Sequence, residues 1–340
     1  MTWLPLLLAD PSPNLRYLVL RELMDRPEKD SEVVELSRMR AEDPLVSELL
    51  ELQKLDGSWN TLGGTQKSGR MNSTIYALSR LGYLGYSVDF PAVSKGAEFL
   101  FSRQGEDGSW PLGGYAIDEE MGYSMIPLQT ALPLRALAAC GYATDPRSER
   151  AYAWLLEKRL PEGVWPSGIA AGNYAGVAGY RRLAHSRWGC RTNTTGALEC
   201  LSLHPERKDD EGTRKALDLL LGRETRERTY LGFEVARLLG TEHIGGIFTH
   251  YARFDLAQIL SLSWRVGASA ADERVGDMIS GVREMQGSQG LWQYLPSPYL
   301  SRWVTFDVLR SLLRLDREIE WISTEPRTPF SAYGKKEMRF

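Results

Sequence analysis

The 340-residue chain has 43% hydrophobic and 25% charged residues, the composition of an ordinary globular protein. Its formal net charge of −3 gives no basic footprint, so we expect no nucleic-acid partner. Three cysteines are too few for a disulfide framework, which favours a reducing compartment. The opening apolar run, Trp3 to Ala9, is too short to span a membrane and lacks a signal peptide's basic front. We therefore expect a cytoplasmic protein. These features are also compatible with peripheral membrane contact, and the oligomeric state is left open.

Apolar residues at helical spacing predict a series of helix pairs. Helices 123–140 and 251–266 are apolar nearly all round, as inner helices must be, whereas a partner such as 146–160 is amphipathic. Gly-rich stretches at 62–69, 111–122 and 163–180 are longer than turns require, and we expect them at one mouth of the assembly. In chain order the predicted helices cover 13–25, 31–53, 72–82, 90–103, 123–140, 146–160, 192–203, 210–223, 251–266, 272–286 and 302–316.

A Gly-Trp segment ends most of these pairs. Residues 53–59 read Q-K-L-D-G-S-W and 103–110 read R-Q-G-E-D-G-S-W, with related segments at 158–165 and 285–292. Each glycine can adopt positive φ, and each tryptophan can bury about 150–250 Å² while its indole N–H finds a partner. We interpret the segment as a clamp between repeats. The fourth unit is degenerate, with Phe233 in the position of the tryptophan.

These Q-x-x-D-G-S-W segments resemble the Gln-Trp repeats of squalene and hopene cyclases and, more loosely, those of protein prenyltransferase β subunits. The resemblance covers nearly the whole chain and extends to single-toroid prokaryotic proteins with this repeat. It implies an all-α fold, an α/α toroid of inner and outer helices. One domain would cover residues 1–340, with repeats at 13–59, 72–110, 123–165, 192–233 and 251–292, a closing helix at 302–316 packed beside 13–25, and a tail at 317–340.

Candidate catalytic acids lie at the heads of the inner helices. Aligning the repeats places Thr74, Thr194, Asp255 and Asp307 in one register, which predicts a polar collar at the mouth of a central cavity. Squalene–hopene-type cyclases hold a protonating aspartate at this place within a D-x-D-D motif, so the resemblance implies Asp255 as the first choice of acid, then Asp307. The full motif is absent here. An aspartate in the first turn of a helix also stabilises the helix dipole, so a structural role is equally compatible.

A second acidic cluster, Asp118, Glu119 and Glu120, precedes the third inner helix. Clustered carboxylates raise one another's pKa, and a raised pKa suits a general acid near neutral pH. Asp118 is therefore the third candidate acid. Solvated loop charges are the favoured alternative.

Zinc is an alternative cofactor. Prenyltransferase β subunits bind zinc through an Asp-x-Cys heading one inner helix and a His heading the next. Cys190 and His250 match two of these places, whereas Trp188 occupies the aspartate position and His185 lies nearby. Because catalytic zinc needs three protein ligands, the prediction is no cofactor, with a zinc-dependent prenyltransferase-like enzyme as an alternative.

Aromatic residues near the inner-helix heads are candidates for substrate binding, although most aromatics in a ring of helices fill its core. An aromatic-lined cavity suits an isoprenoid and stabilises a carbocation by about 2 kcal/mol per dry ring face. The predicted function is a terpene-cyclase-like enzyme acting on a polyprenyl substrate, with a non-catalytic toroid that binds a lipid, peptide or protein as the alternative. The candidates are Tyr76, Tyr115, Tyr123, Trp188, Phe248, Tyr251, Phe254, Trp303 and Phe306.

Overall fold

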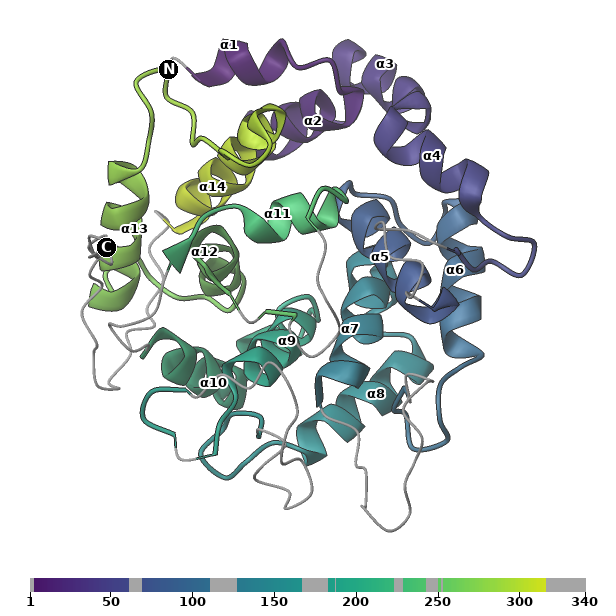
Figure 1. Cartoon of the computed structure of the whole chain (residues 1–340), viewed down its shortest axis with the longest axis vertical. Helices are drawn as coiled ribbons and strands as arrows, with labels where there is room; N and C mark the ends of the chain where they lie inside the picture. The colour runs from purple at the N-terminus through teal and green to yellow at the C-terminus, as the bar shows by residue number, and fades with distance from the viewer. Residues whose placement is uncertain are drawn as a thin grey trace, which may run out of the picture.

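The computed structural model describes residues 3–60, 69–110, 127–166, 183–186, 188–222, 229–242, 250–251 and 253–315, and these are mostly helical. Figure 1 shows the helices around a common centre, one set inside and another outside. The inner set comprises α2 (Pro13–Leu18) continued by η1 (Val19–Leu23), α5 (Arg70–Tyr83), α7 (Pro127–Leu137), α9 (Arg191–Leu201), α12 (Leu256–Arg265) and α14 (Ser301–Leu315). The outer set comprises α3 (Ser31–Met39), α4 (Pro44–Leu52), α6 (Pro91–Phe101), α8 (Pro146–Glu157), α10 (Glu211–Leu221) and α13 (Glu273–Glu284).

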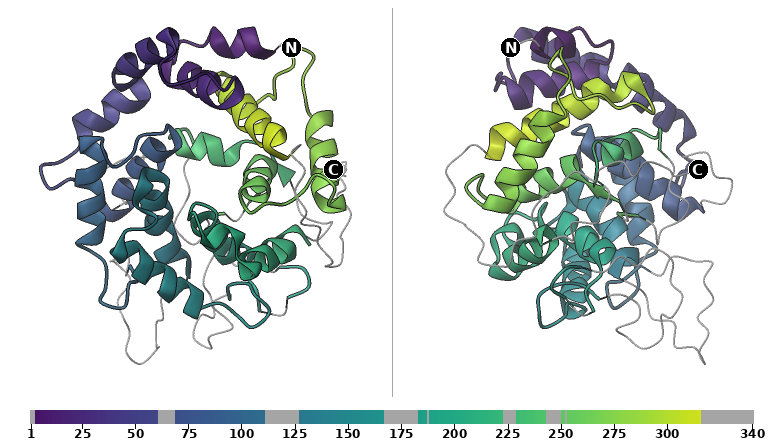
Figure 2. Two further views of the ribbon diagram at one scale, coloured as in Figure 1. Left: turned by 180° about the vertical axis from the view of Figure 1, so that it is seen from behind. Right: turned by 60° about the vertical axis from the view of Figure 1, so that its left-hand side comes forward.

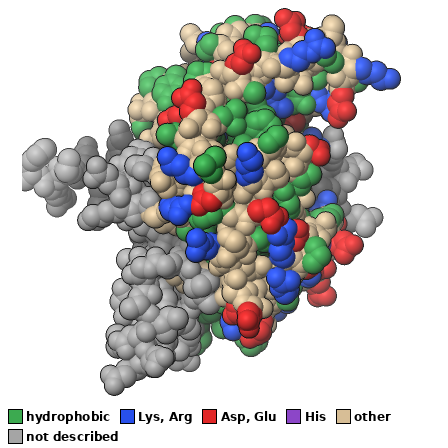
Figure 3. Space-filling model, turned by 90° about the vertical axis from the view of Figure 1, so that its right-hand side faces the viewer, with side chains coloured by type: hydrophobic (Ala, Val, Ile, Leu, Met, Phe, Trp, Pro, Cys, Tyr) green, Lys and Arg blue, Asp and Glu red, His purple; other side chains and the backbone are tan. Residues whose placement is uncertain are grey.

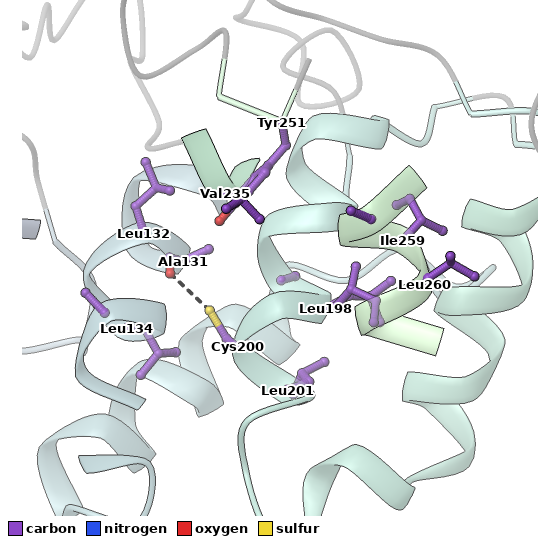
Figure 4. Packing of buried hydrophobic residues seen from close by; sticks show 14 of the residues in the cluster. Ala131, Leu132, Leu134, Leu198, Cys200, Leu201, Val235, Tyr251, Ile259 and Leu260 are labelled. Carbon is purple, nitrogen blue, oxygen red and sulfur yellow. Dashed lines mark hydrogen bonds between the residues drawn. The ribbon is translucent and has the colours of Figure 1, made fainter. Parts of the chain in front are cut away.

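The inner helices form the core. Every residue of α7 and of α9 is buried, as expected for helices that have neighbours on all sides. The two pack closely because α9 has Gly196, where a Cβ would lie 2.7 Å from a methyl carbon of Leu128. Figure 4 shows this layer, in which the Cys200 thiol donates to the carbonyl oxygen of Ala131 at 3.0 Å. The outer helices show one polar face, as predicted for amphipathic partners.

The four Gly-Trp segments have one local structure. Gly57, Gly108, Gly163 and Gly290 have φ between 80° and 103°, which is the left-handed region. Each tryptophan is buried, and its indole Nε1 donates to the carbonyl oxygen ten residues earlier at 2.7–2.8 Å. The backbone N–H of each tryptophan donates to a threonine Oγ1 on an inner helix, and the four pairs are Trp59 with Thr74, Trp110 with Thr130, Trp165 with Thr194 and Trp292 with Thr305.

The last helix of the described chain meets the first ones. α14 packs against η1 and against α1 (Trp3–Leu8), and Arg310 pairs with Glu22 at 3.4 Å. Arg302 pairs with Asp10 at 3.2 Å. Both views in Figure 2 show α14, in yellow, beside the purple N-terminal elements. Residues of α14 thus contact residues of the predicted helix 13–25.

Several elements differ from their predicted bounds. The predicted helix 31–53 is broken into α3 and α4 by η2 (Arg40–Glu42) and Asp43, because Pro44 cannot continue a helix and begins a new one. The predicted helix 251–266 begins only at Leu256, after β2 (Phe254–Asp255), which pairs in parallel with β1 (Thr229–Tyr230). Sequence reasoning missed α1 and α11 (Phe233–Leu238).

The surface carries both signs of charge. Figure 3 shows one face, on which acidic and basic side chains are interspersed without a continuous field of either sign. Within the ranges given above, no helix is both long and apolar enough to cross a membrane.

Candidate functional site

The helix α11 lies inside the arrangement of inner helices around the common centre, which is called the ring below. It lies between α5 and α14 in Figure 1 and contacts both. The carbonyl oxygen of Leu238, its last residue, accepts a hydrogen bond from Arg80 Nε of α5 at 3.1 Å. At its other end Gly232 has a φ of 81° and lies so close to Val304 of α14 that a Cβ would come within 2.4 Å of it. A short unpredicted helix therefore fills space at the centre of the ring.

Asp255 holds α11 in place. Its Oδ1 accepts hydrogen bonds from the backbone N–H groups of Gly232 at 2.9 Å and Ala257 at 3.1 Å, and its Oδ2 accepts from Glu234 at 2.7 Å. The carboxyl group is buried, which raises its pKa to about 6 even though the N–H donors favour the charged form. Asp255 thus caps α12 and ties α11 to it. The carboxyl group is buried as expected of an acid, and it is also a structural link.

The structure corrects the predicted polar collar. Thr74 and Thr194 accept the backbone N–H of a tryptophan, so their hydroxyls serve the Gly-Trp segments. The equivalent residue on α14 is Thr305, which places Asp307 two positions outside the register. In the fourth unit Asp255 takes the threonine's place, since it receives the N–H groups on either side of Phe233.

Buried ion pairs connect the inner helices through the ring. Arg135 of α7 pairs with Glu199 of α9 at 3.4 Å and with Glu234 of α11 at 2.5 Å. Glu234 also pairs with Arg237 at 2.5 Å, and Glu199 with Arg265 of α12 at 3.3 Å. Burial opposes the ionisation of Glu234, but Arg237 and Arg135 outweigh it and lower its pKa to about 2. Charged groups, rather than aromatic rings alone, therefore fill the middle of the ring.

Asp307 belongs to a separate ion pair. It bonds to Arg310 one turn later on α14, and Arg310 also reaches Glu22. Burial raises the pKa of Asp307, while Arg310 and Arg265 act in the opposite direction. An acid held by an arginine keeps its charge more readily, so this geometry favours a structural role for Asp307 over proton donation.

The predicted aromatic residues are divided between the core and the surface. Tyr251, Phe254, Trp303 and Phe306 are buried, whereas Trp188 is 39% exposed and so lies at the surface. Tyr251 extends toward Val235 of α11 in Figure 4, and its hydroxyl accepts a hydrogen bond from Arg135 at 2.8 Å. None of these five candidates, and not Tyr76 either, is among the residues that line the cavity described below.

Tyr76, His250 and Tyr251 do come together. The ring centroids of Tyr76 and His250 are 6.4 Å apart, and those of His250 and Tyr251 are 4.5 Å apart. Burial, with a contribution from the Arg237 charge, lowers the pKa of His250 well below its usual value, so the imidazole is neutral. Its Nε2 has no hydrogen-bond partner within the described structure.

The two predicted metal ligands are both buried, but no group of three or more His, Cys, Asp or Glu side chains that could hold a metal occurs within the described ranges. Cys190 is the residue that precedes α9, and His250 lies in the aromatic group above. Other predicted site residues lie outside the described residues, namely Asp118, Glu119, Glu120, Tyr115, Tyr123 and Phe248.

A cavity of about 230 Å³ lies at the C-terminal ends of the inner helices. The sequence predicts its candidate acids at the N-terminal ends. The cavity lining includes Tyr83 at the end of α5, Trp264 and Arg265 at the end of α12, and Arg310 in the second half of α14. Arg135 of α7 lines it as well and joins it to the buried ion pairs. Neither Asp255 nor Asp307 is part of this lining.

Comparison with known proteins then shows that part of the chain is similar to squalene-hopene cyclases and related enzymes. Residues 28–182 match the squalene-hopene cyclase C-terminal domain family. Squalene–hopene cyclase of Zymomonas mobilis is 30% identical over 148 residues, which are 42% of this chain and 21% of that enzyme. Lanosterol synthase of Candida albicans is 28% identical over 33% of this chain and 15% of its own length. These matches confirm the resemblance that the Gly-Trp segments predict. The matched part of this chain spans about a fifth or less of the length of these relatives.

Solved structures give a weaker match. A protein from Actinoplanes has a TM-score of 0.45 and 17% identity, with 90% of each chain covered. The type II terpene cyclase MstE from Scytonema, in complex with the substrate geranylgeranyl dihydroxybenzoate, has a TM-score of 0.33 and 16% identity, with 80% of this chain and 95% of MstE covered. Neither match assigns a role to a residue of this chain.

The buried ion pairs could in part be predicted from the sequence. Arginines lie in the second half of several inner helices, including Arg80 on α5, Arg135 on α7, Arg265 on α12, and Arg310 with Arg314 on α14. An arginine on a helix without a solvent face needs a buried partner. Helices α9 and α14 each contain an acid that could serve, Glu199 and Asp307 respectively. The ion pairs of Glu234 could not be predicted, because the helix that carries it, α11, was not predicted.

We expect the Glu234 carboxylate to make stability depend on pH. Its pKa is about 2 when folded and close to the ordinary value of 4.5 when unfolded. Stability from this group is therefore present above pH 4.5 and is lost as pH falls toward 2. Between pH 6 and pH 3 the wild type should lose about 2 kcal/mol more than Glu234→Gln. Urea denaturation of both proteins at several pH values measures this, and a constant difference between them would contradict it.

Proposed function

We propose that this chain is a terpene-cyclase-like enzyme that acts on an isoprenoid. The match of residues 28–182 to the squalene-hopene cyclase C-terminal domain family carries the proposal. We further infer that the inner and outer helices form a closed α/α toroid, since α14 packs against η1 and α1. The substrate would bind at the end of the ring where the inner helices begin.

Aromatic side chains support a carbocation reaction at that end. The rings of Tyr76, His250 and Tyr251 come together between α5 and the residues that precede α12. Ring faces attract a cation by about 2 kcal/mol or more when water is excluded. A neutral His250 adds no positive charge to repel the cation.

Asp255 is the acid in this proposal. A carboxylate offers about four acceptor positions, and backbone N–H groups use three of them. The remaining position can hold a proton. With a pKa of about 6, an appreciable fraction of Asp255 is protonated in mildly acidic solution. Transfer of that proton to a carbon–carbon double bond would generate the carbocation.

The test is turnover of squalene, geranylgeranyl diphosphate and geranylgeranyl dihydroxybenzoate, followed by mass spectrometry for cyclised isomers. Asp255→Thr is the informative variant, because threonine accepts the equivalent N–H groups in the other units. We expect it to fold and to lose turnover by at least a hundredfold. Asp255→Asn is less suitable, since its amide NH2 would face backbone N–H donors. Wild-type turnover should fall as pH rises above 6, and retained turnover in Asp255→Thr would refute this role.

A second candidate is a non-catalytic toroid that binds a lipid, peptide or protein. The observation that favours it is that α11 and its ion pairs occupy the interior, and that Arg237 already lies 5.6 Å from the centre of the Tyr76 ring. A resident cation there competes with a carbocation for the same ring. Binding of an isoprenoid without any product would favour this candidate over the enzyme.

A further inference from the structure

The cavity of about 230 Å³ at the C-terminal ends of the inner helices is rich in cations. The guanidinium groups of Arg135, Arg265 and Arg310 all line it, and Glu22 is the one carboxylate among the lining residues that the structure describes. The carbonyl ends of helices favour cations, which accounts for arginines at this place. Most of the carboxylates that pair with these arginines, namely Glu199, Glu234 and Asp307, are not part of the cavity lining.

Arg265 is the least compensated of the three. Its closest carboxylate is Glu199 at 3.3 Å, which also pairs with Arg135 at 3.4 Å. Its hydrogen bonds go to neutral oxygens, the Ser202 hydroxyl at 3.0 Å and the carbonyl and hydroxyl of Ser261 at 3.2 and 3.0 Å. Burial lowers the pKa of Arg265 even though Glu199 opposes that effect. A further anion beside Arg265 would relieve this deficit.

The lining also contains buried polar atoms without a partner in the described structure. They are the Tyr83 hydroxyl, Trp264 Nε1 and Arg310 Nε. All three can donate a hydrogen bond, and the two nitrogens can only donate. Buried donors left unpaired cost about 1–3 kcal/mol each, so such a group calls for an explanation. A ligand rich in acceptors would satisfy them.

We propose that this cavity binds a small organic carboxylate whose apolar part contacts Leu203, Leu238 and Ala139. A guanidinium matches a carboxylate in geometry, and Arg265 and Arg310 provide two from different helices. Tyr83 and Trp264 add neutral donors and ring surface. The site lies at the opposite end of the ring from the proposed isoprenoid site and shares none of the residues assigned to that site.

Calorimetric titration with benzoate, benzamide and inorganic phosphate tests the proposal. Because the chain has ten tryptophans, the second readout is the benzoate-induced change in tryptophan fluorescence that is lost in Trp264→Phe. Benzoate should bind at millimolar concentration or below, and benzamide at least tenfold more weakly because it has no charge. Tyr83→Phe and Arg265→Gln should each weaken benzoate binding at least tenfold. The exposed Arg283, changed to Gln, removes the same charge away from the cavity and should leave binding unchanged.

Tyr83→Phe also separates binding from folding. Because the Tyr83 hydroxyl has no partner, the ligand-free variant should melt at the same temperature as the wild type or slightly higher. No heat with benzoate, equal binding of benzamide, or benzoate binding unchanged in Tyr83→Phe and Arg265→Gln would each overturn the proposal. Binding of phosphate in place of benzoate would overturn the carboxylate specificity.

Discussion

Replacement of Trp110 by alanine is expected to lower the free energy of unfolding by about 3–5 kcal/mol. The indole is fully buried, its Nε1 donates to the carbonyl oxygen of Leu100 at 2.8 Å, and its backbone N–H reaches Thr130 of the next inner helix at 3.3 Å. Truncation removes the ring from the layer between inner and outer helices and leaves the Leu100 carbonyl without this donor. The effect is large because the ring joins two units.

Chemical denaturation of the purified protein measures this cost. Leu295→Ala is the matched control, since Leu295 is 83% exposed and its removal should change stability by less than about 0.5 kcal/mol. The free energy of unfolding of Trp110→Phe should lie between those of the wild type and Trp110→Ala, because phenylalanine retains a ring but has no indole N–H. A cost of less than about 1 kcal/mol for Trp110→Ala would show that the segment does not act as an anchor.

The second large effect is expected from Arg135→Met. This change leaves Glu234 and the fully buried Glu199 short of a counter-ion, and breaking a buried ion pair from one side costs about 3–5 kcal/mol. Adding Glu199→Gln to Arg135→Met should recover part of the loss, because the second change removes the uncompensated charge. Additive destabilisation in the double variant would contradict this account.

The control for Arg135 is an exposed ion pair. Arg26 lies 3.4 Å from Asp30, and its side chain is 52% exposed. Arg26→Met should therefore cost less than about 0.5 kcal/mol, measured by the same denaturation experiment. The comparison separates the burial of the charges from the mere presence of an ion pair.

The repeating parts of this fold could be predicted because each repeat has a local cause. Gly108 needs positive φ, Trp110 needs burial, and both follow from the residue types. The helix α11 could not be predicted, because its six residues are too few to show a period, and its position depends on Asp255, 21 to 23 residues away. Missing α11 also hid why Asp255 is buried.

The candidate site was predicted only in part, for the same reason. Asp255 was selected by its position at the head of an inner helix, and the structure places it there. Asp307 was aligned two residues out of register because Thr305, which bonds to Trp292, was not recognised as the repeated residue. The cavity could not be predicted from the residues at the helix N-termini, because it lies at the C-terminal ends of the inner helices, where the arginines gather.

The contact between α14 and η1 has a consequence for synthesis. Glu22 and Arg310 are 288 residues apart, so a loop of that length must close before they meet. Closing it costs about 3 kcal/mol more in chain entropy than closing a loop of ten residues. The apolar face of η1 that α14 covers stays exposed on the ribosome until the chain has been translated through α14. A growing chain of this protein therefore presents a surface that chaperones recognise for most of its synthesis.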